Sequence, residues 1–209
     1  MSALKALVTG FDPFDGDAIN PSYEAVRRLP ARVGKLDVVT AELPTSFTRG
    51  IRKLRALIGR EQPDIVLCVG LAADRAAINV ERVAVNLCHA RIADNDGLQP
   101  VDQPILARGP AAYFSTLPVV NIMKALERAG LRAQMSMSAG TYVCNHLFYE
   151  LMHVAKKNKH VIRAGFVHVP ALPVADAECA LANLVRALEI VLRITQRSAK
   201  AATRKAADA

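Results

Sequence analysis

The chain of 209 residues contains no tryptophan, only ten phenylalanine and tyrosine residues, and four widely spaced cysteines. No two cysteines form a C-x-x-C pair, so neither a disulfide framework nor a structural zinc site is expected. No apolar run approaches the ~18 residues of a membrane span, and the apolar stretch at the start is too short for a signal peptide. These absences favour a globular protein in a reducing, cytoplasmic compartment, without membrane association.

The signatures of several enzyme classes are missing as well. The sequence has no H-E-x-x-H, no G-x-S-x-G, no G-x-x-x-x-G-K-[ST] and no dinucleotide-binding glycine pattern. Their absence argues against metallopeptidases, serine hydrolases of the nucleophile-elbow type and nucleotide-dependent enzymes. We therefore expect neither a metal nor a cofactor.

The formal net charge of +8 raises the possibility of nucleic-acid binding. Four of the basic residues lie in residues 195–209, and a short basic run at 156–160 follows a predicted helix, where cations suit the helix dipole. The remaining basic residues are scattered and are not interleaved with aromatic ones. A nucleic-acid partner is therefore not expected.

Apolar strand-like segments alternate with amphipathic helical ones along the chain. Strands are predicted at residues 3–9, 36–42, 64–69, 77–87, 133–137 and 161–169, and helices at 23–29, 46–60, 119–129, 144–157 and 175–194. Residues 90–118 hold four prolines and two glycines with little periodicity, which indicates a functional loop. The alternation predicts a single α/β domain over residues 1–195, a three-layer α/β/α arrangement with a twisted, mostly parallel sheet. Residues 196–209 are predicted to form a basic, Ala-rich, frayed tail.

Cys144 is the first candidate catalytic residue. It begins the apolar face of the predicted helix 144–157, directly after the small-residue segment Ser138-Ala139-Gly140. Unpaired N–H groups and the positive end of the dipole at a helix N-terminus favour a thiolate. A cysteine on an apolar helix face is nevertheless more often a buried core residue, so the helix alone does not assign a nucleophile.

A thiol nucleophile needs a base, which is usually histidine. His146 and His153 point away from Cys144 around the helix, and His160 lies in a polar connection, whereas His89 stays possible at the start of the long loop. His168 lies at the carboxyl end of a predicted strand, where active sites of open α/β sheets are found. A histidine hydrogen-bonded to a neighbouring loop explains that position equally well.

Two charged residues are candidates to assist such a pair. Glu81 lies within an apolar strand pattern, where a carboxylate costs several kcal/mol unless a partner meets it. It could orient the histidine as the third member of a triad, or it could form an ordinary ion pair with an arginine. Arg91, four positions after the end of this strand pattern, could place a cation near the same cleft.

Four ordered segments resemble the motifs of the pyroglutamyl peptidase I (pyrrolidone-carboxylate peptidase) family of cysteine peptidases. They are Val8-Thr9-Gly10-Phe11-Asp12-Pro13-Phe14 with Asn20-Pro21-Ser22, Glu81-Arg82-Val83-Ala84-Val85-Asn86, Ser138-Ala139-Gly140-Thr141-Tyr142-Val143-Cys144-Asn145, and Gly165-Phe166-Val167-His168-Val169-Pro170. They run in the family's order from residue 8 to about residue 173. The resemblance implies a single α/β/α domain, often assembled into homotetramers, and no metal or cofactor.

The resemblance also implies roles for individual residues. Cys144 would be the nucleophile, His168 the base and then the acid, and Glu81 the orienting carboxylate, so that N-terminal pyroglutamyl residues leave peptides through a thioester acyl-enzyme. Arg91 and the Cys144 N–H would polarise the acyl oxygen. The residues implied in binding the pyroglutamyl ring are Phe11, Phe14, Asn20, Tyr142 and Val143.

The loop after the third strand departs from the family pattern. Where the family usually reads Gly-Gln-Ala-Gly-Gly-Arg, this chain reads Gly70-Leu71-Ala72-Ala73-Asp74-Arg75. Because Leu71 lacks the side-chain amide of the family's glutamine, two alternatives to a pyroglutamyl peptidase stay open. One is a cysteine amidase of altered specificity, and the other is a non-catalytic ligand-binding relative.

Overall fold

The computed structural model describes residues 3–158, 160 and 163–207 of the chain. Nine strands and five helices are assigned there. The strands are β1 (Leu4–Phe11), β2 (Arg32–Val33), β3 (Leu36–Leu43), β4 (Ile65–Leu71), β5 (Ile78–Glu81), β6 (Val83–Val85), β7 (Ala112–Phe114), β8 (Ala133–Ser136) and β9 (Arg163–Val169). The helices are α1 (Pro21–Val26), α2 (Arg49–Glu61), α3 (Val119–Arg128), α4 (Val143–Lys157) and α5 (Ala177–Ala207).

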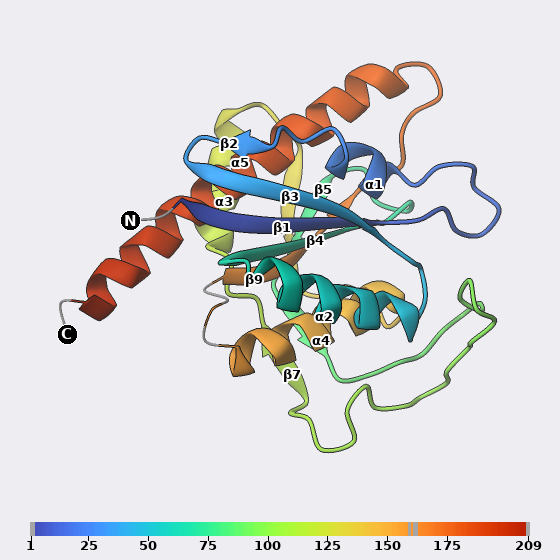
Figure 1. The fold of residues 1–209 in the computed structure, drawn as a ribbon. Helices are drawn as coiled ribbons and strands as arrows, with labels where there is room; N and C mark the ends of the chain where they lie inside the picture. Colours follow the sequence, from blue (N-terminus) through green and yellow to red (C-terminus); the bar gives the residue numbers. More distant parts are fainter. Residues whose placement is uncertain (1–2, 159, 161–162, 208–209) are drawn as a thin grey trace.

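Seven of these strands form one twisted sheet in the order β2-β3-β1-β4-β9-β5-β8. The pairs β3–β1, β1–β4, β4–β9 and β5–β8 are parallel, and β2–β3 and β9–β5 are antiparallel. Helices α1, α3 and α5 cover one face, and α2 and α4 cover the other (Figure 1). The predicted three-layer α/β/α domain with a mostly parallel sheet is confirmed.

Successive side chains of a strand point to opposite faces of the sheet, and this alternation determines on which face each catalytic candidate lies. On β9, Val167 and Val169 pack with the helices of the first face, whereas Ala164 and Phe166 pack with α2 and α4. His168 has the parity of Phe166 and therefore lies on the face that α4 covers. The same rule places Glu81 on that face, because its neighbour Val80 packs on the opposite one.

The prediction of one strand over residues 77–87 was wrong. The segment divides into β5, in the main sheet, and β6, which pairs with β7 in a separate two-stranded sheet. Arg82 links the two sheets, since its N–H donates to Ser136 O at 2.8 Å and its carbonyl accepts from Ser115 N at 2.9 Å. Beyond it, the side chain of Asn145 hydrogen-bonds both N and O of Val85 (3.0 and 2.9 Å), so β6 is directed to α4 and not to the sheet.

The last helix is longer than the predicted helix at 175–194. It continues as α5 as far as Ala207, and the alanine, lysine and arginine residues of this segment are strong helix formers. The first two residues of the predicted strand 161–169 lie outside the described residues. No helix in the described part of the chain is long and apolar enough to cross a membrane.

Candidate active site

A cleft of about 410 Å³ opens at the carboxyl ends of β1, β4 and β9, beside the N-terminus of α4. Parallel strands end together at this edge, which is where open α/β sheets bind their ligands. Eight of the nine site residues predicted from the sequence line the cleft: Phe11, Phe14, Asn20, Arg91, Tyr142, Val143, Cys144 and His168. The ninth, Glu81, is fully buried behind it.

Cys144 is the second residue of α4, and its half-buried thiol faces the cleft. Burial and then the nearby Glu81 carboxylate raise the pKa of the thiol to about 12, although the cysteine's own N–H acts in the opposite direction. The thiolate expected from the helix N-terminus is therefore not the resting form. The neutral thiol needs a base beside it to become a nucleophile.

Strand pairing places His168 next to Cys144. Gly70 of β4 is the register partner of His168 on β9. A Cβ built on Gly70 would lie 2.9 Å from Cys144 Sγ, so the thiol rests directly on this glycine. His168 is buried except where it reaches the cleft, and its ring packs against Phe166 with centroids 4.8 Å apart.

Glu81 fixes the orientation of His168. Its Oε1 lies 2.8 Å from His168 Nδ1, and both side chains are buried. A carboxylate accepts a hydrogen bond, so Nδ1 carries the proton and Nε2 is the nitrogen that can accept one. The structure thus brings together a thiol, an oriented imidazole and a buried carboxylate on one face of the sheet.

A model of the pyroglutamyl peptidase family matches residues 4–204. The chain belongs to the pyroglutamyl peptidase family. Pyrrolidone-carboxylate peptidase 1 of Ralstonia nicotianae is 51% identical over 172 residues, covering 82% of this chain and 80% of that protein. The crystal structure of pyroglutamyl peptidase I from Bacillus amyloliquefaciens is 42% identical, with a TM-score of 0.87 over 92% of this chain and 95% of that one. A mutant pyrrolidone carboxyl peptidase from Pyrococcus furiosus gives 35% identity and a TM-score of 0.89 over 93% and 99%.

In this pyroglutamyl peptidase family member, aromatic rings form one wall of the cleft. Phe14 packs on Tyr142 with ring centroids 5.4 Å apart, and Phe47 makes an edge contact with Tyr142 at the same distance. Phe11 is almost entirely buried and contacts the Phe166 ring, so it belongs chiefly to the core. Phe14 and Tyr142 therefore offer a ligand more ring surface in the cleft than Phe11 does.

Asn20 has a structural role that the sequence did not indicate. Its Oδ1 accepts hydrogen bonds from Ser22 N and Ser22 Oγ, at 3.1 and 2.8 Å, and so caps α1. Its Nδ2 donates to Asp12 O at 2.9 Å. The amide thus holds the β1–α1 loop that carries Phe14.

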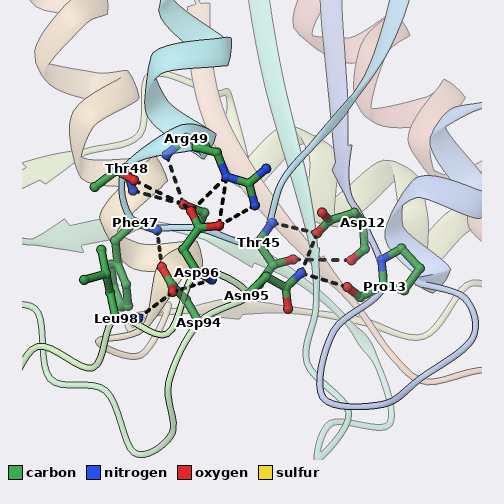
Figure 2. A network of polar contacts seen from close by, with 11 residues as sticks. Asp12, Pro13, Thr45, Phe47, Thr48, Arg49, Asp94, Asn95, Asp96 and Leu98 are labelled. Atoms are coloured by element: carbon green, nitrogen blue, oxygen red, sulfur yellow. Dashed lines mark hydrogen bonds and ion pairs between the residues drawn. The ribbon is translucent and has the colours of Figure 1, made fainter.

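The long loop between β6 and β7 is fixed to the cleft walls by Asp94. The buried carboxylate of Asp94 accepts hydrogen bonds from the N–H groups of Phe47, Asp96 and Leu98 at 2.8–2.9 Å (Figure 2). Three backbone donors on one carboxylate define the turn that follows Arg91. These hydrogen bonds explain how a loop with so little periodicity can hold Arg91 in place at the cleft.

Three further hydrogen bonds join this loop to the segments that carry cleft residues. Asn95 Nδ2 donates to Asp12 Oδ1 at 3.2 Å and to Pro13 O at 3.0 Å (Figure 2). The hydroxyl of Tyr142 donates to Ala93 O at 2.9 Å. Arg91 itself lines the cleft, and no ion pair or side-chain hydrogen bond is assigned to its guanidinium among the described residues.

The other histidines have different partners. His146 Nδ1 lies 3.0 Å from Cys88 Sγ, and His153 Nδ1 lies 2.8 Å from the hydroxyl of Tyr113. His160 Nε2 contacts Gln62 O, and His89 is exposed without lining the cleft. None of these four histidines lines the cleft that holds Cys144, whereas His168 does.

Arg75 is a site residue that the sequence analysis did not single out. It lines the cleft and forms an ion pair with Glu81, with Nη1 3.1 Å from Oε1. A signal was available, since a carboxylate in an apolar strand requires a cation and Arg75 lies in the loop just before that strand. Leu71, where the family usually has glutamine, also lines the cleft.

We expect Gly70→Ala to lower kcat/KM by about 10²-fold, since small displacements of catalytic groups cost that much. The new methyl group would lie 2.9 Å from Cys144 Sγ and 2.8 Å from the Phe166 ring, too close for either to stay in place. Steady-state kinetics on a pyroglutamyl amide measure this. Gly59→Ala, in α2 with open space around it, is the control and should leave kcat/KM unchanged. Full activity in Gly70→Ala would show that the thiol has room to shift.

Proposed function

We propose that this protein is a cysteine exopeptidase that removes N-terminal pyroglutamyl residues from peptides. The observation that carries the proposal is the Glu81–His168 hydrogen bond of 2.8 Å on the cleft that holds Cys144. The relatives named pyrrolidone-carboxylate peptidase and pyroglutamyl peptidase I support the same substrate.

The cleft suits a neutral five-membered lactam. Pyroglutamate has no free ammonium group, so no carboxylate is required to capture an N-terminus. The Phe14 and Tyr142 rings offer an apolar wall, and the cleft volume is in the range of small-ligand sites. The scissile carbonyl would lie at Cys144, and the departing peptide would extend through the open mouth of the cleft.

Acylation begins with proton transfer from Cys144 Sγ to His168 Nε2 as sulfur attacks the pyroglutamyl carbonyl carbon. The Cys144 N–H stabilises the oxyanion, because Tyr142 forms no side-chain cap at this helix end, and Arg91 adds positive charge. The tetrahedral intermediate then collapses and the C–N bond breaks. The imidazolium Nε2–H protonates the leaving amine, and a thioester remains on Cys144.

Deacylation repeats these steps with water as the nucleophile. His168 Nε2 takes a proton from water as its oxygen attacks the thioester carbonyl. Collapse of the second intermediate breaks the C–S bond, and sulfur recovers the proton from the imidazolium. Glu81 keeps its hydrogen bond to Nδ1 throughout, so the ring cannot rotate away from the sulfur.

A reducing compartment suits this chemistry, and we infer the cytoplasm, because the nucleophile must stay a free thiol. All four cysteines are free in the structure. The resemblance favours a homotetramer. Exposed Val120, Met135 and Met137, on and beside the edge strand β8, support self-association.

A cysteine amidase of altered specificity is a second candidate, and Leu71 favours it. This side chain lines the cleft where a glutamine amide could hydrogen-bond the lactam. Hydrophobic contact does not reject related acyl groups as a hydrogen-bonding amide does. Leu71 would therefore relax selectivity between the pyroglutamyl ring and similar rings.

We expect the native protein to hydrolyse pyroglutamyl amides faster than prolyl amides, and both faster than amides with a free linear N-terminal residue. Leu71→Gln should raise the pyroglutamyl-to-prolyl ratio of kcat/KM by about tenfold, the selectivity gained from one added hydrogen bond. Release of a chromogenic amine from the three substrates measures this. Faster release from the prolyl amide by the native protein would favour the amidase over the peptidase.

A further inference from the structure

Glu81 presents an electrostatic problem that His168 does not solve. Its carboxylate is completely buried, and burial of an anion costs several kcal/mol unless a charged partner meets it. His168 cannot supply a permanent charge, because only a neutral imidazole can accept the Cys144 proton. The partner that carries permanent charge is Arg75, whose Nη1 lies 3.1 Å from Glu81 Oε1, the same oxygen that His168 contacts.

Arg75 holds this position through contacts on several sides. Besides Glu81, its Nη1 donates to Ser136 Oγ at 3.0 Å, and its Nη2 donates to Ser138 O at 2.9 Å. Ser136 is the register partner of Glu81 on the neighbouring strand β8. Ser138 lies in the loop that leads from β8 to α4 and Cys144. One planar guanidinium therefore links the carboxylate strand to the loop that carries the nucleophile.

We propose that Arg75 is a positioning residue that keeps Glu81 ionised and limits how strongly Glu81 retains a proton on His168. Without a cation at Oε1, the carboxylate would stabilise the imidazolium more strongly. His168 would then stay protonated to higher pH and could not accept the Cys144 proton. Arg75 thus sets the pH at which the site becomes active. The inference rests on the proposed peptidase function but assigns a residue that this function does not require.

Other ionisable groups surround the pair, and none of them replaces Arg75. Cys144 of α4 faces the imidazole, and Cys68 is buried beneath the thiol on β4. Four more groups line the cleft from its loops: Asp15, Asp17, Asp74 and Arg91. No ion pair joins any of these four to Glu81 or His168 in the described part of the chain. Substitution of Arg75 leaves all of them in place.

The test compares the pH profiles of kcat/KM for the native protein, Arg75→Gln, Arg75→Lys and the control Arg82→Gln. Arg82 is adjacent to Glu81 in sequence, but its guanidinium stands over the Phe114 ring, 5.9 Å from the centroid. We expect Arg75→Gln to lower kcat/KM at neutral pH by about 10²-fold and to move the acid limb upward by about one pH unit. Arg75→Lys should keep the limb near its native position, and Arg82→Gln should change neither quantity.

A double-mutant cycle separates this role from a merely structural one. If Arg75 acts through Glu81, Arg75→Gln should cost less than about threefold in a Glu81→Gln background. An equal loss in both backgrounds, or a loss without movement of the acid limb, would overturn the proposal.

NMR titration of the His168 ring compares the native protein with Arg75→Gln in the absence of substrate. The His168 signals are assigned by their absence from the spectrum of His168→Gln. A native protein that hydrolyses no pyroglutamyl amide would refute the proposed function, whereas an unmoved His168 midpoint in Arg75→Gln would refute the role of Arg75.

Discussion

Cys144→Ala is expected to abolish hydrolysis of pyroglutamyl amides, with kcat reduced by about 10⁶-fold, the cost of losing the nucleophile in a serine peptidase. The substitution removes the sulfur that forms the thioester. With a pKa of about 12, the Cys144 thiol is inert at neutral pH unless His168 removes its proton. Activity that depends on Cys144 is therefore evidence for the thiol and its base together. Release of a chromogenic amine under single-turnover conditions measures the loss.

Cys179→Ala is the matched control for this substitution. Cys179 is an exposed free cysteine on α5, outside the cleft. Its removal should leave kcat and KM at their native values, so that any effect of Cys144→Ala is not a general effect of thiol loss. Binding of a pyroglutamyl amide to Cys144→Ala should persist, since the ring contacts lie elsewhere. Undiminished release by Cys144→Ala would rule out its assignment as the nucleophile.

Glu81→Gln is expected to lower kcat by about 10³- to 10⁴-fold, a smaller loss than that of Cys144→Ala. A glutamine amide can donate a hydrogen bond to Nδ1 and so favours the tautomer with its proton on Nε2. That tautomer cannot accept the thiol proton. The nucleophile and the cleft remain, so KM should change little. Steady-state kinetics on the same amide measure both quantities.

Glu150→Gln provides the comparison for Glu81→Gln. Glu150 is also a buried glutamate with an arginine partner, Arg55, whose Nη2 lies 2.5 Å from Glu150 Oε2. It lies on α4 outside the cleft, so its substitution should reduce thermal stability and leave kcat near the native value. Equal losses of kcat in the two variants would mean that Glu81 acts through the stability of the fold. A loss in Glu81→Gln as large as that in Cys144→Ala would mean that Glu81 does more than orient the imidazole.

Much of the fold was predictable because strand and helix periods are local properties of the sequence. The period of 3.6 residues places Cys144 on the inner face of α4, and the period of two places His168 on the face that α4 covers. Pairing partners are not local. The division of residues 77–87 into β5 and β6 depends on Asn145, which is distant in sequence and hydrogen-bonds Val85.

The candidates for the site were easier to predict than their energetics. A helix start, a strand end and a charge in an apolar strand made Cys144, His168 and Glu81 candidates with structural alternatives, and the family motifs then selected them. The protonation of Cys144 was not predictable, because burial outweighs the helix N-terminus and burial depends on the whole fold. Arg75 was missed for a related reason, since two of its three acceptors, Ser136 Oγ and Ser138 O, are 61 and 63 residues away in sequence.

The most direct measurement is mass spectrometry of the protein after acid quenching during reaction with a pyroglutamyl nitrophenyl ester. An activated ester acylates quickly, so the thioester accumulates before water removes it. The proposed mechanism predicts one added pyroglutamyl group per chain, located by peptide mapping on Cys144, and none on Cys144→Ala. An acyl group on another residue, or turnover by Cys144→Ala at the native rate, would contradict it.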